Sequence, residues 1–365
     1  MKAGIITHYD VHNHGAHLQL YALARQLGQL GYDAHALQYK KNYDFLASGA
    51  EAKYSISLRS IPIYIKYLMQ HGIKRTLYNI KKKKMLEAFR RNQRLVGEYY
   101  SKANDLDVAV IGSDEIFSIE TGLNPWFFGM GVPCRHVISY AASFGPTTLD
   151  FIKEHHAEEF VSAGLKRIDQ ISVRDQNSAA VVEHYKGARP PIVCDPVILY
   201  DFSKERVKHQ NCAPAKTKYC IVYSYDNHMN DPETVKAIKQ YAKLHRMKIY
   251  SVGYHHKWCD RNIHASPLEL FDWFEKAQLV FTDTFHGTVL SLVTGSQFFA
   301  KIGTNQNKMM YLLTQFGVQS QLVSSFNEVN GEAERRIDYD VVNERIREVK
   351  RASLDYLKRA LGIVE

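Results

Sequence analysis

Short apolar runs, each closed by turn residues, alternate with helical patterns along most of the chain. Residues 108–111 read Val-Ala-Val-Ile, a continuous apolar run typical of parallel strands that are buried on both faces. The β–α–β alternation predicts an α/β protein with doubly wound parallel sheets. The predicted strands are residues 2–7, 34–39, 108–111, 137–141, 170–173, 192–194, 219–223, 248–252, 279–282 and 298–302, and the predicted helices include residues 18–30, 178–185, 232–244, 268–276 and 288–293.

The alternation is interrupted once, over residues 201–218, which are polar, contain Pro214 and show no periodicity. A chain of 365 residues is also too long for one ordinary core. We therefore predict an N-terminal Rossmann-like domain over residues 1–205 and a smaller C-terminal Rossmann-like domain over residues 206–336. A C-terminal amphipathic helix over residues 337–365 could return to the first domain.

The positive charge of the protein is concentrated in one segment. The sequence has 47 Lys and Arg against 38 Asp and Glu, a formal charge of +9 with a pI of about 9.1. Between residues 40 and 102 the counts are 15 and 4, so the remaining 32 and 34 leave the rest of the chain at −2. We therefore expect a basic helical insertion over about residues 42–104 of the first domain.

The basic insertion mixes apolar and aromatic residues with cations, as in residues 61–69 and around the four lysines at 81–84. This composition suits a surface helix that contacts a membrane carrying anionic lipid. A solvated lid whose lysines face water is an alternative. A nucleic-acid-binding surface would have to be made by this same segment.

The sequence predicts neither a membrane span nor secretion. No stretch approaches the roughly 18–20 apolar residues of a span, and the chain turns polar at Thr7 and His8 before a signal-peptide core could form. The five cysteines are scattered and never form a C-x-x-C pair, which argues against a disulfide framework and a zinc knuckle. We expect a cytoplasmic protein, peripheral to the inner face of the membrane if the insertion binds lipid.

The strongest signal for chemistry is residues 279–291, where an apolar run enters a polar turn and then a helix. His286 and the amides around Gly287 should lie at a helix N-terminus on the carboxyl edge of a sheet. Open α/β folds bind ligands at that edge, and helix N-termini attract phosphates and carboxylates. The helix dipole favours a neutral imidazole that can accept a proton. His286 could instead only cap the helix, and Asp283 or Thr284 could be the N-cap.

Two further polar turns follow predicted strands. Gly112 permits a tight turn after one buried strand, and Asp114 and Glu115 follow at its carboxyl end. Arg174 follows another strand and is placed to bind an oxyanion. The alternatives are an N-cap for Asp114 and a structural ion pair for Arg174. The candidate partners of that ion pair are Asp175 and Asp195.

The turn after the first predicted strand carries four histidines within ten residues, from His8 to His17. They lack a His-x-x-x-His pair on an established helix with a carboxylate partner, so we expect no metal site. Asn13 and Gly15, at the start of the helix, are more typical of a turn that contacts phosphate. The sequence has no G-x-G-x-x-G motif, no Walker loop and no Ser-His-Asp or Cys-His arrangement.

Several motifs, in this order, resemble those of the polysaccharide pyruvyl transferase family. The resemblance covers roughly residues 4–325, without the basic insertion. Each motif is moderately specific, but their common order is hard to obtain by accident. The motifs are Asn13-His14-Gly15-Ala16-His17 with the helix that follows, Gly112-Ser113-Asp114, Ser172-Val173-Arg174-Asp175, Asp195-Pro196, Thr282-Asp283-Thr284-Phe285-His286-Gly287-Thr288, and residues 308–317, which are similar to the family's R-x-x-x-L-L…G pattern.

The resemblance implies a GT-B-like fold of two facing Rossmann-like domains with parallel sheets. It implies a transferase that moves the enolpyruvyl unit of phosphoenolpyruvate onto two hydroxyls of one sugar, forming a pyruvate ketal and releasing phosphate. The acceptor would belong to a bacterial exopolysaccharide or other cell-envelope glycan precursor, either lipid-linked or free. Phosphoenolpyruvate is then a co-substrate, and no metal or other cofactor is implied.

The resemblance also implies roles for particular residues. The family's essential histidine, its arginine and its acidic residue match His286, Arg174 and Asp114, which we expect to be catalytic. His286 would act as the base on a sugar hydroxyl, with Asp114 as its counterpart or as a hydroxyl ligand. The donor is expected to contact Arg174, Thr284, Phe285, Gly287, Thr288 and Lys308, and the acceptor to contact Asn13, His14, Gly15, Asp114 and Glu115.

The chain departs from the family pattern at one place. Some members have Arg-Leu-His where this chain has Thr284, Phe285 and His286. An anion-binding arginine is therefore missing, and Lys301 or Lys308 could supply the cation in its place.

Two other functions are compatible with the sequence. A glycosyltransferase that uses a nucleotide sugar would have the same two-domain architecture and could also employ His286. A nucleic-acid-binding protein would use the basic insertion, but that function leaves the residues at the strand ends unexplained.

Overall fold

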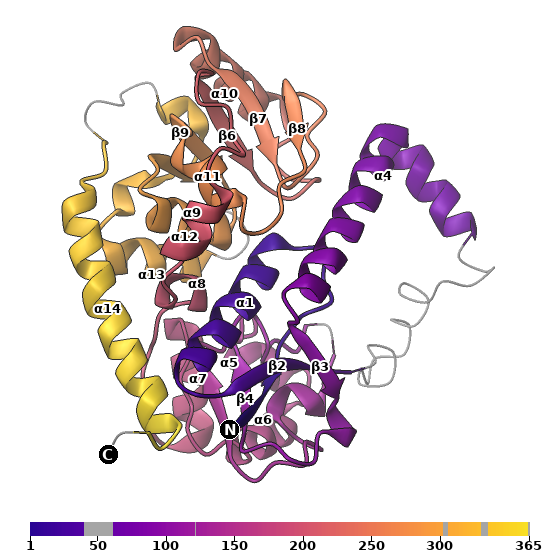
Figure 1. Cartoon of the computed structure of the whole chain (residues 1–365), viewed down its shortest axis with the longest axis vertical. Coiled ribbons are helices and arrows are strands. Elements are labelled where there is room, and N and C mark those ends of the chain that lie inside the picture. Colours follow the sequence, from indigo (N-terminus) through magenta and orange to yellow (C-terminus); the bar gives the residue numbers. More distant parts are fainter. Residues whose placement is uncertain (40–60, 121, 302–305, 330–334, 364–365) are drawn as a thin grey trace. The chain divides into compact units, whose positions relative to one another are not determined.

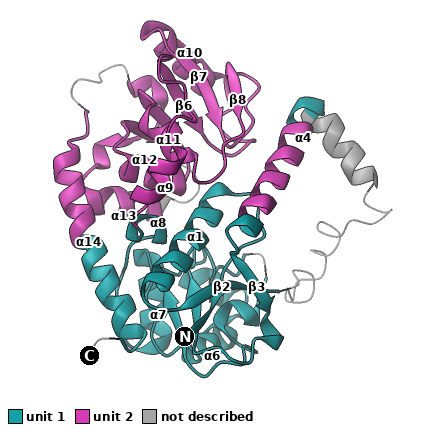
Figure 2. Cartoon of the chain, in the orientation of Figure 1, with its two compact units in different colours: residues 1–76, 90–200, 349–365 teal, residues 77–89, 201–348 magenta. Residues whose placement is uncertain are grey.

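The computed structural model describes residues 1–39, 61–120, 122–301, 306–329 and 335–363 (Figure 1). The chain forms two compact units (Figure 2). Unit 1 comprises Met1–Thr76, Arg90–Tyr200 and Val349–Glu365, and unit 2 comprises Leu77–Phe89 and Asp201–Glu348. The first part of the predicted insertion, residues 42–60, lies outside the described residues.

Unit 1 is built on a five-stranded parallel sheet in the order β3-β2-β1-β4-β5. The central strand places Gly4 between His35 of one neighbour and Ala109 of the other. Both central strands are apolar and almost wholly buried, as the sequence pattern predicts for parallel strands. The strands are β1 (Lys2–Ile6), β2 (Asp33–Gln38), β3 (Val96–Tyr99), β4 (Val108–Gly112) and β5 (Val137–Tyr140).

Two predicted strands of this unit do not form ladders. Residues 170–173 and 192–194 make only isolated parallel bridges. Backbone hydrogen bonds do join Ser139 to Gln170 and to Ser172, and the Ser139 and Ser172 hydroxyls each add a bond to the other residue's carbonyl. The left-handed backbone at Ala141, with a φ of 52°, interrupts the extended conformation between the two bridges. A further difference concerns β3, which the sequence pattern assigned to a helical insertion and which instead pairs with β2.

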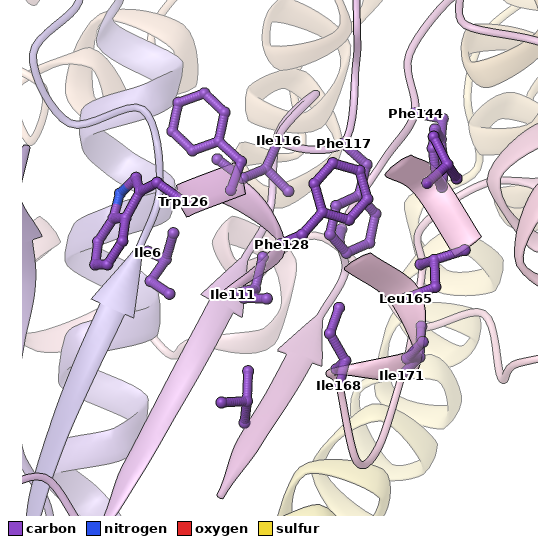
Figure 3. Packing of buried hydrophobic residues seen from close by; sticks show 14 of the residues in the cluster. Ile6, Ile111, Ile116, Phe117, Trp126, Phe128, Phe144, Leu165, Ile168 and Ile171 are labelled. Atoms are coloured by element: carbon purple, nitrogen blue, oxygen red, sulfur yellow. The ribbon is translucent and has the colours of Figure 1, made fainter. Parts of the chain in front are cut away.

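A buried apolar cluster packs against this sheet in unit 1. Figure 3 shows part of that core, in which Ile6, Ile111 and Phe128 belong to one buried cluster. The first helix begins at His14, earlier than the predicted residue 18, because Asn13 caps it. The helical elements are α1 (His14–Gln29), η2 (Tyr100–Lys102), η3 (Pro125–Phe128), α5 (Leu149–Glu154), α6 (Glu158–Lys166), α7 (Gln176–Lys186) and α8 (Pro196–Leu199).

Unit 2 is built on a six-stranded parallel sheet in the order β11-β10-β9-β6-β7-β8. Its strands are β6 (Tyr219–Tyr223), β7 (Lys248–Val252), β8 (Arg261–Ile263), β9 (Leu279–Thr282), β10 (Phe298–Lys301) and β11 (Leu322–Val323). Its helices are α9 (Ser203–His209), α10 (Pro232–Leu244), α11 (Leu270–Glu275), α12 (Phe285–Thr294), α13 (Gln306–Phe316) and η4 (Gln319–Gln321).

The long helix α4 (Ile61–Asn92) contains a kink at Gly72, whose φ of 74° is left-handed. Residues 77–89 of α4 belong to unit 2. There the Tyr78 hydroxyl donates to the Ile263 carbonyl at 2.8 Å, and the Asn79 amide donates to Asp226 at 2.8 Å. This part of the helix is therefore packed into unit 2. None of the helices in the described ranges combines the length and apolarity that crossing a bilayer requires.

The four lysines at 81–84 differ in exposure because of the way α4 packs. The side chains of Lys81, Lys83 and Lys84 are exposed. Lys82 is only 4 % exposed, and its ammonium lies 3.7 Å from the centroid of the Tyr254 ring. Burial lowers the pKa of Lys82 to about 8. The prediction that these lysines form one basic surface is therefore wrong for Lys82.

The buried Lys82 should make stability depend on pH in a specific window. Its pKa is about 8 in the folded protein and near 10.5 when unfolded, so the unfolded chain binds more protons between these values. Relative to Lys82→Met, the free energy of unfolding of the natural protein should therefore rise by about 1–3 kcal/mol from pH 8 to pH 10.5. Paired urea titrations across this range measure the difference, and parallel stability curves would contradict it.

The C-terminal helix α14 (Tyr339–Ala360) contributes its last residues, from Val349 onward, to unit 1. The Tyr356 hydroxyl donates to the Ser139 carbonyl at 2.9 Å, and the Ser353 hydroxyl accepts the Cys194 amide at 2.9 Å. These bonds attach the end of α14 to the strand region of unit 1.

Candidate active site

In unit 1, the order of the strands reverses between β1 and β4, which are neighbours in the sheet but are separated in sequence by β2 and β3. Open α/β sheets bind ligands at the carboxyl ends of such a pair. The chain leaves β4 through Ser113 and Asp114, whose φ angles of 44° and 60° are both left-handed. Left-handed backbone at non-glycine residues stores strain and gathers at functional sites.

The predicted residues Asp114 and Arg174 meet at this point. Arg174 donates one hydrogen bond to Asp114 at 3.2 Å and another to Asp195 at 3.1 Å. The side chain of Arg174 is 1 % exposed, that of Asp195 is 0 % exposed and that of Asp114 is 20 % exposed. The guanidinium therefore holds Asp114 at the edge of a buried ion-pair cluster, and the predicted pairing with Asp195 is present.

Carboxylates outnumber cations in this cluster. Burial opposes the charge on Arg174, but Asp114 and Asp195, followed by Glu115 and Asp175, outweigh this effect and raise the pKa of the guanidinium. Asp175 does not bond Arg174, because it caps α7 through the Ser178 amide. Hydroxyl groups of a ligand could donate to the carboxylates at the exposed edge of the cluster.

The turn before α1 is a closed hydrogen-bond network. The Asn13 side chain accepts the Gly15 amide at 2.8 Å, and His17 lies with Nδ1 2.7 Å from the Asn13 carbonyl. Arg90 of α4 lies 3.0 Å from Nε2 of His17 and forms an ion pair with Asp10 at 3.1 Å. Burial lowers the pKa of His17 to about 4, so the ring is neutral, donating through Nδ1 and accepting through Nε2. Both ring nitrogens are thus engaged.

The predicted acceptor residues are not equally accessible. His14 and Gly15 are buried in the first turn of α1, and the Asn13 oxygen serves as its N-cap. Glu115, by contrast, is partly exposed and packs against Gly145.

In unit 2 the strand order reverses between β6 and β9, and the β9–α12 turn lies at this second switch point. Thr284 is the N-cap of α12, since its hydroxyl accepts the Gly287 amide at 3.0 Å. The Thr282 hydroxyl donates to the Tyr223 carbonyl at 2.7 Å and joins the turn to β6. A Cβ at Gly287 would lie 2.1 Å from the Thr282 hydroxyl, so only glycine fits. These contacts hold the turn in one conformation and place His286 in the first turn of α12.

The two candidate replacement cations differ in position. The Lys308 ammonium, on α13, lies 5.7 Å from the centroid of the Phe285 ring, beside the β9–α12 turn. The Lys301 ammonium instead donates to Thr234 at 2.8 Å, at the start of α10. Thr288 contacts Met309 through its hydroxyl, 3.2 Å from the sulfur. Lys308 is therefore the cation that the structure brings to the turn.

Sequence reasoning missed His228, which lies in the loop after β6. Its Nδ1 is 2.9 Å from the Asp283 carboxylate in the β9–α12 turn. Because Thr284 caps α12, Asp283 is available for this pair. No local pattern marks His228, and only the adjacency of β6 and β9 brings it to the site.

One group among the described residues has the spacing of metal ligands. Donor atoms of His209, Cys212 and Glu269 lie within 4.8 Å of one another in unit 2. None of these three residues belongs to the predicted site, and the Glu269 carboxylate already accepts the Ser266 amide at 2.7 Å.

Comparison with solved structures finds proteins of similar fold. S. aureus MnaA, in a co-structure with UDP, is 12 % identical and covers 100 % of this chain and 97 % of its own, with a TM-score of 0.51. The α,α-trehalose 6-phosphate synthase of Burkholderia multivorans is 10 % identical and covers 98 % and 97 %, with a TM-score of 0.53. At such identities the likeness concerns the fold alone. The predicted α/β, GT-B-like class with two parallel sheets is confirmed.

Comparison of sequences identifies the family. A search of curated proteins gives no significant match. The family model described as polysaccharide pyruvyl transferase matches residues 13–301, which is most of the chain and includes the predicted residues of both switch points from Asn13 to Thr288. The chain therefore belongs to the polysaccharide pyruvyl transferase family, as its motifs predicted.

Proposed function

We propose that the protein transfers the enolpyruvyl unit of phosphoenolpyruvate to two hydroxyls of one sugar in a bacterial cell-surface glycan precursor, forming a pyruvate ketal and releasing phosphate. Membership of the family supports this proposal. The observation that carries it is the position of the predicted residues, because Asp114 and His286 each lie at the switch point of their own unit.

The charges of phosphoenolpyruvate are best matched by the β9–α12 turn. The first amides of a helix lack intrahelical partners and attract phosphate and carboxylate groups. The first two amides of α12 are those of Phe285 and His286, whereas the Gly287 and Thr288 amides already donate to the hydroxyl and the carbonyl of Thr284. Lys308 adds a positive charge beside Phe285. These residues would bind the donor without the arginine that some family members have.

The hydroxyls of the sugar are best matched by the acidic cluster of unit 1. Asp114 and Glu115 could accept hydrogen bonds from an acceptor, while Arg174 holds Asp114 in place. Arg174 would thus act mainly as a positioning residue rather than as the donor ligand that the resemblance implied. Asn13, with its oxygen capping α1, would contribute by shaping the turn.

The proposed chemistry needs balanced proton transfers. Two C–O bonds form at C2 of phosphoenolpyruvate, and the C2–O bond to phosphate breaks with its electron pair leaving on phosphate. Of the two hydroxyl protons, one ends on C3, which becomes a methyl group, and the other ends on phosphate as HPO₄²⁻. His286 would take the proton of the first attacking hydroxyl as general base.

The test is phosphate release from phosphoenolpyruvate against a panel of galactose, glucose and N-acetylmannosamine glycosides, free and lipid-linked. We expect acceptor-dependent release of one phosphate for each new ketal methyl group seen by NMR. Phosphate release without a ketal, or no release with any acceptor, would contradict the proposal.

A nucleotide-sugar glycosyltransferase is the second candidate, because the solved structures of similar fold include one with UDP bound. Thermal shift separates the two functions. Phosphoenolpyruvate should raise the melting temperature at concentrations where UDP does not, and the reverse result would favour glycosyl transfer.

We also propose that α4 contacts the inner face of the cytoplasmic membrane. Ile73, Leu77 and Ile80 are exposed and lie at helical spacing on one face of α4. Exposed lysines, Lys81 and Lys84 among them, lie along the same part of the helix. An apolar stripe flanked by lysines suits the interface of a membrane that carries anionic lipid, such as one holding a lipid-diphosphate-linked acceptor.

Charge reversal on α4 should therefore weaken vesicle binding. The triple change Lys81→Glu, Lys83→Glu and Lys84→Glu leaves buried Lys82 intact. At about 1 kcal/mol per lysine near the surface, affinity for phosphatidylglycerol-containing vesicles should fall on the order of 10²-fold or more, while turnover of a soluble acceptor is kept.

The matched control reverses three exposed lysines of α10, Lys236, Lys239 and Lys243. This control has the same net charge as the α4 variant, but it should bind vesicles much more strongly than the α4 variant does. If both variants lose vesicle affinity equally, net charge alone accounts for the loss. That result would contradict a specific role for α4.

A further inference from the structure

We propose that His228, held by Asp283, is a second acid–base catalyst that works together with His286. This inference rests on the proposed function and adds a residue to it. It begins from the switch point of unit 2, where β6 and β9 lie side by side. The loop after β6 carries His228, and the turn after β9 carries Asp283 and His286.

The geometry of the Asp283–His228 pair is that of an oriented imidazole. Nδ1 of His228 lies 2.9 Å from one Asp283 oxygen, and the side chains are 10 % exposed for Asp283 and 45 % exposed for His228. The other oxygen of Asp283 is buried and has no hydrogen-bond partner among the described residues. A buried carboxylate of this kind orients the ring through Nδ1 and leaves Nε2 as the nitrogen that can exchange a proton with a ligand.

The loop that carries His228 is itself fixed. The His228 amide donates to the Tyr225 carbonyl at 2.9 Å, and the ring of Tyr225 meets the imidazole edge-on with centroids 5.5 Å apart. The His228 carbonyl lies 3.2 Å from Nε2 of His256. Locked rotamers of this kind are what a catalytic group requires.

A second such group suits the chemistry, because C3 can then gain a proton at the same time as His286 takes one from the first hydroxyl. While neutral His286 takes the first hydroxyl proton, another group must deliver a proton to C3. Asp114 is poorly suited to that step, since it is already engaged as the acceptor of a hydrogen bond from Arg174. Protonated His228, oriented by its bond to Asp283, would deliver that proton from Nε2.

Each histidine then returns to its starting protonation state. As the C2–O bond to phosphate breaks, the imidazolium of His286 returns its proton to the leaving phosphate. The second hydroxyl attacks C2 and gives its proton to the now neutral His228. Both histidines regain their initial protonation, and the products are the ketal and HPO₄²⁻, with no proton exchanged with solvent overall.

The experiment compares His228→Gln with the natural protein in phosphate release from phosphoenolpyruvate, using the acceptor found active in the panel. We expect kcat to fall by about 10²- to 10⁴-fold with the KM for phosphoenolpyruvate and the melting temperature nearly unchanged. Asp283→Asn should lower kcat less, because it misorients the imidazole but keeps it. Added imidazole should partly restore turnover to His228→Ala.

The matched control is His136→Gln, which removes another His–Asp pair, 3.2 Å from Asp169, before β5 of unit 1. It should keep full turnover. If the natural protein releases no phosphate with any acceptor, the proposed function fails, and this inference fails with it. If the natural protein is active but His228→Gln keeps its kcat, or loses activity only through a lower melting temperature without imidazole rescue, the inference alone is overturned.

Discussion

Replacing His286 by alanine should lower kcat for phosphate release from phosphoenolpyruvate by about 10²- to 10⁴-fold. The physical reason is the loss of the base that takes the hydroxyl proton. The start of α12 should survive the change, because Thr284 supplies the N-cap hydrogen bond to the Gly287 amide. Steady-state kinetics with saturating acceptor measures the effect, and the KM for phosphoenolpyruvate should change far less than kcat.

Because His286 is buried, His286→Ala could also lose activity through disturbed packing. A second variant separates this effect from the loss of the base. His286→Gln keeps most of the side-chain volume and a hydrogen-bonding group but cannot carry a proton at neutral pH. It should lose activity to a similar extent with a melting temperature close to that of the natural protein. Full turnover in His286→Ala would exclude a catalytic role for this residue.

Replacing Arg174 by methionine is expected to produce the largest loss of stability among the predicted site residues. The change leaves the Asp195 carboxylate, which is fully buried, without its countercharge, and it frees Asp114 as well. Breaking a buried pair in this way costs about 3–5 kcal/mol of unfolding free energy. Urea unfolding, followed by a probe in unit 1, measures the loss, and an unchanged midpoint would contradict the structural role.

Asp114→Asn separates the functional part of this cluster from its structural part. Asp114 is partly exposed, and an asparagine oxygen can still accept from Arg174. We therefore expect a stability change well below that of Arg174→Met, together with a clear loss of turnover or a raised KM for the acceptor. If Asp114→Asn has the same kcat and acceptor KM as the natural protein, the cluster has only a structural role.

Much of the fold could be predicted from local sequence patterns. Apolar runs such as Val108–Gly112 mark buried parallel strands because both faces of these strands are covered. The strand–turn–helix structure around His286 could also be predicted, since a polar turn between an apolar run and a helical pattern is compatible with few other structures. Asp114 and His286 follow strands, as the sequence predicted, whereas Arg174 follows a segment that makes only isolated bridges.

Other elements could not be predicted, because long-range contacts decide them. The short β3 forms only because β2 presents an edge to it, and nothing in its four residues requires a strand. Residues 170–173 have the composition of a strand, yet they form only isolated bridges, because the left-handed backbone at Ala141 interrupts the extended segment beside them. The pattern of the four lysines at 81–84 likewise could not reveal that Lys82 packs against Tyr254.

The site divides in the same way. Which residue types end each strand is a local property, so Asp114, Arg174 and the β9–α12 turn could be named from the sequence. Which of these side chains lie in contact depends on the order of the strands in the sheet. Strand β9 lies beside β6, and this adjacency brings Asp283 to His228 across 55 positions of the chain. Periodicity and turn chemistry act over a few residues, whereas pairing of side chains depends on packing between distant segments. For that reason the sequence specified two α/β sheets with polar strand ends, and only the folded structure decided which of those polar groups are paired, buried or available for chemistry.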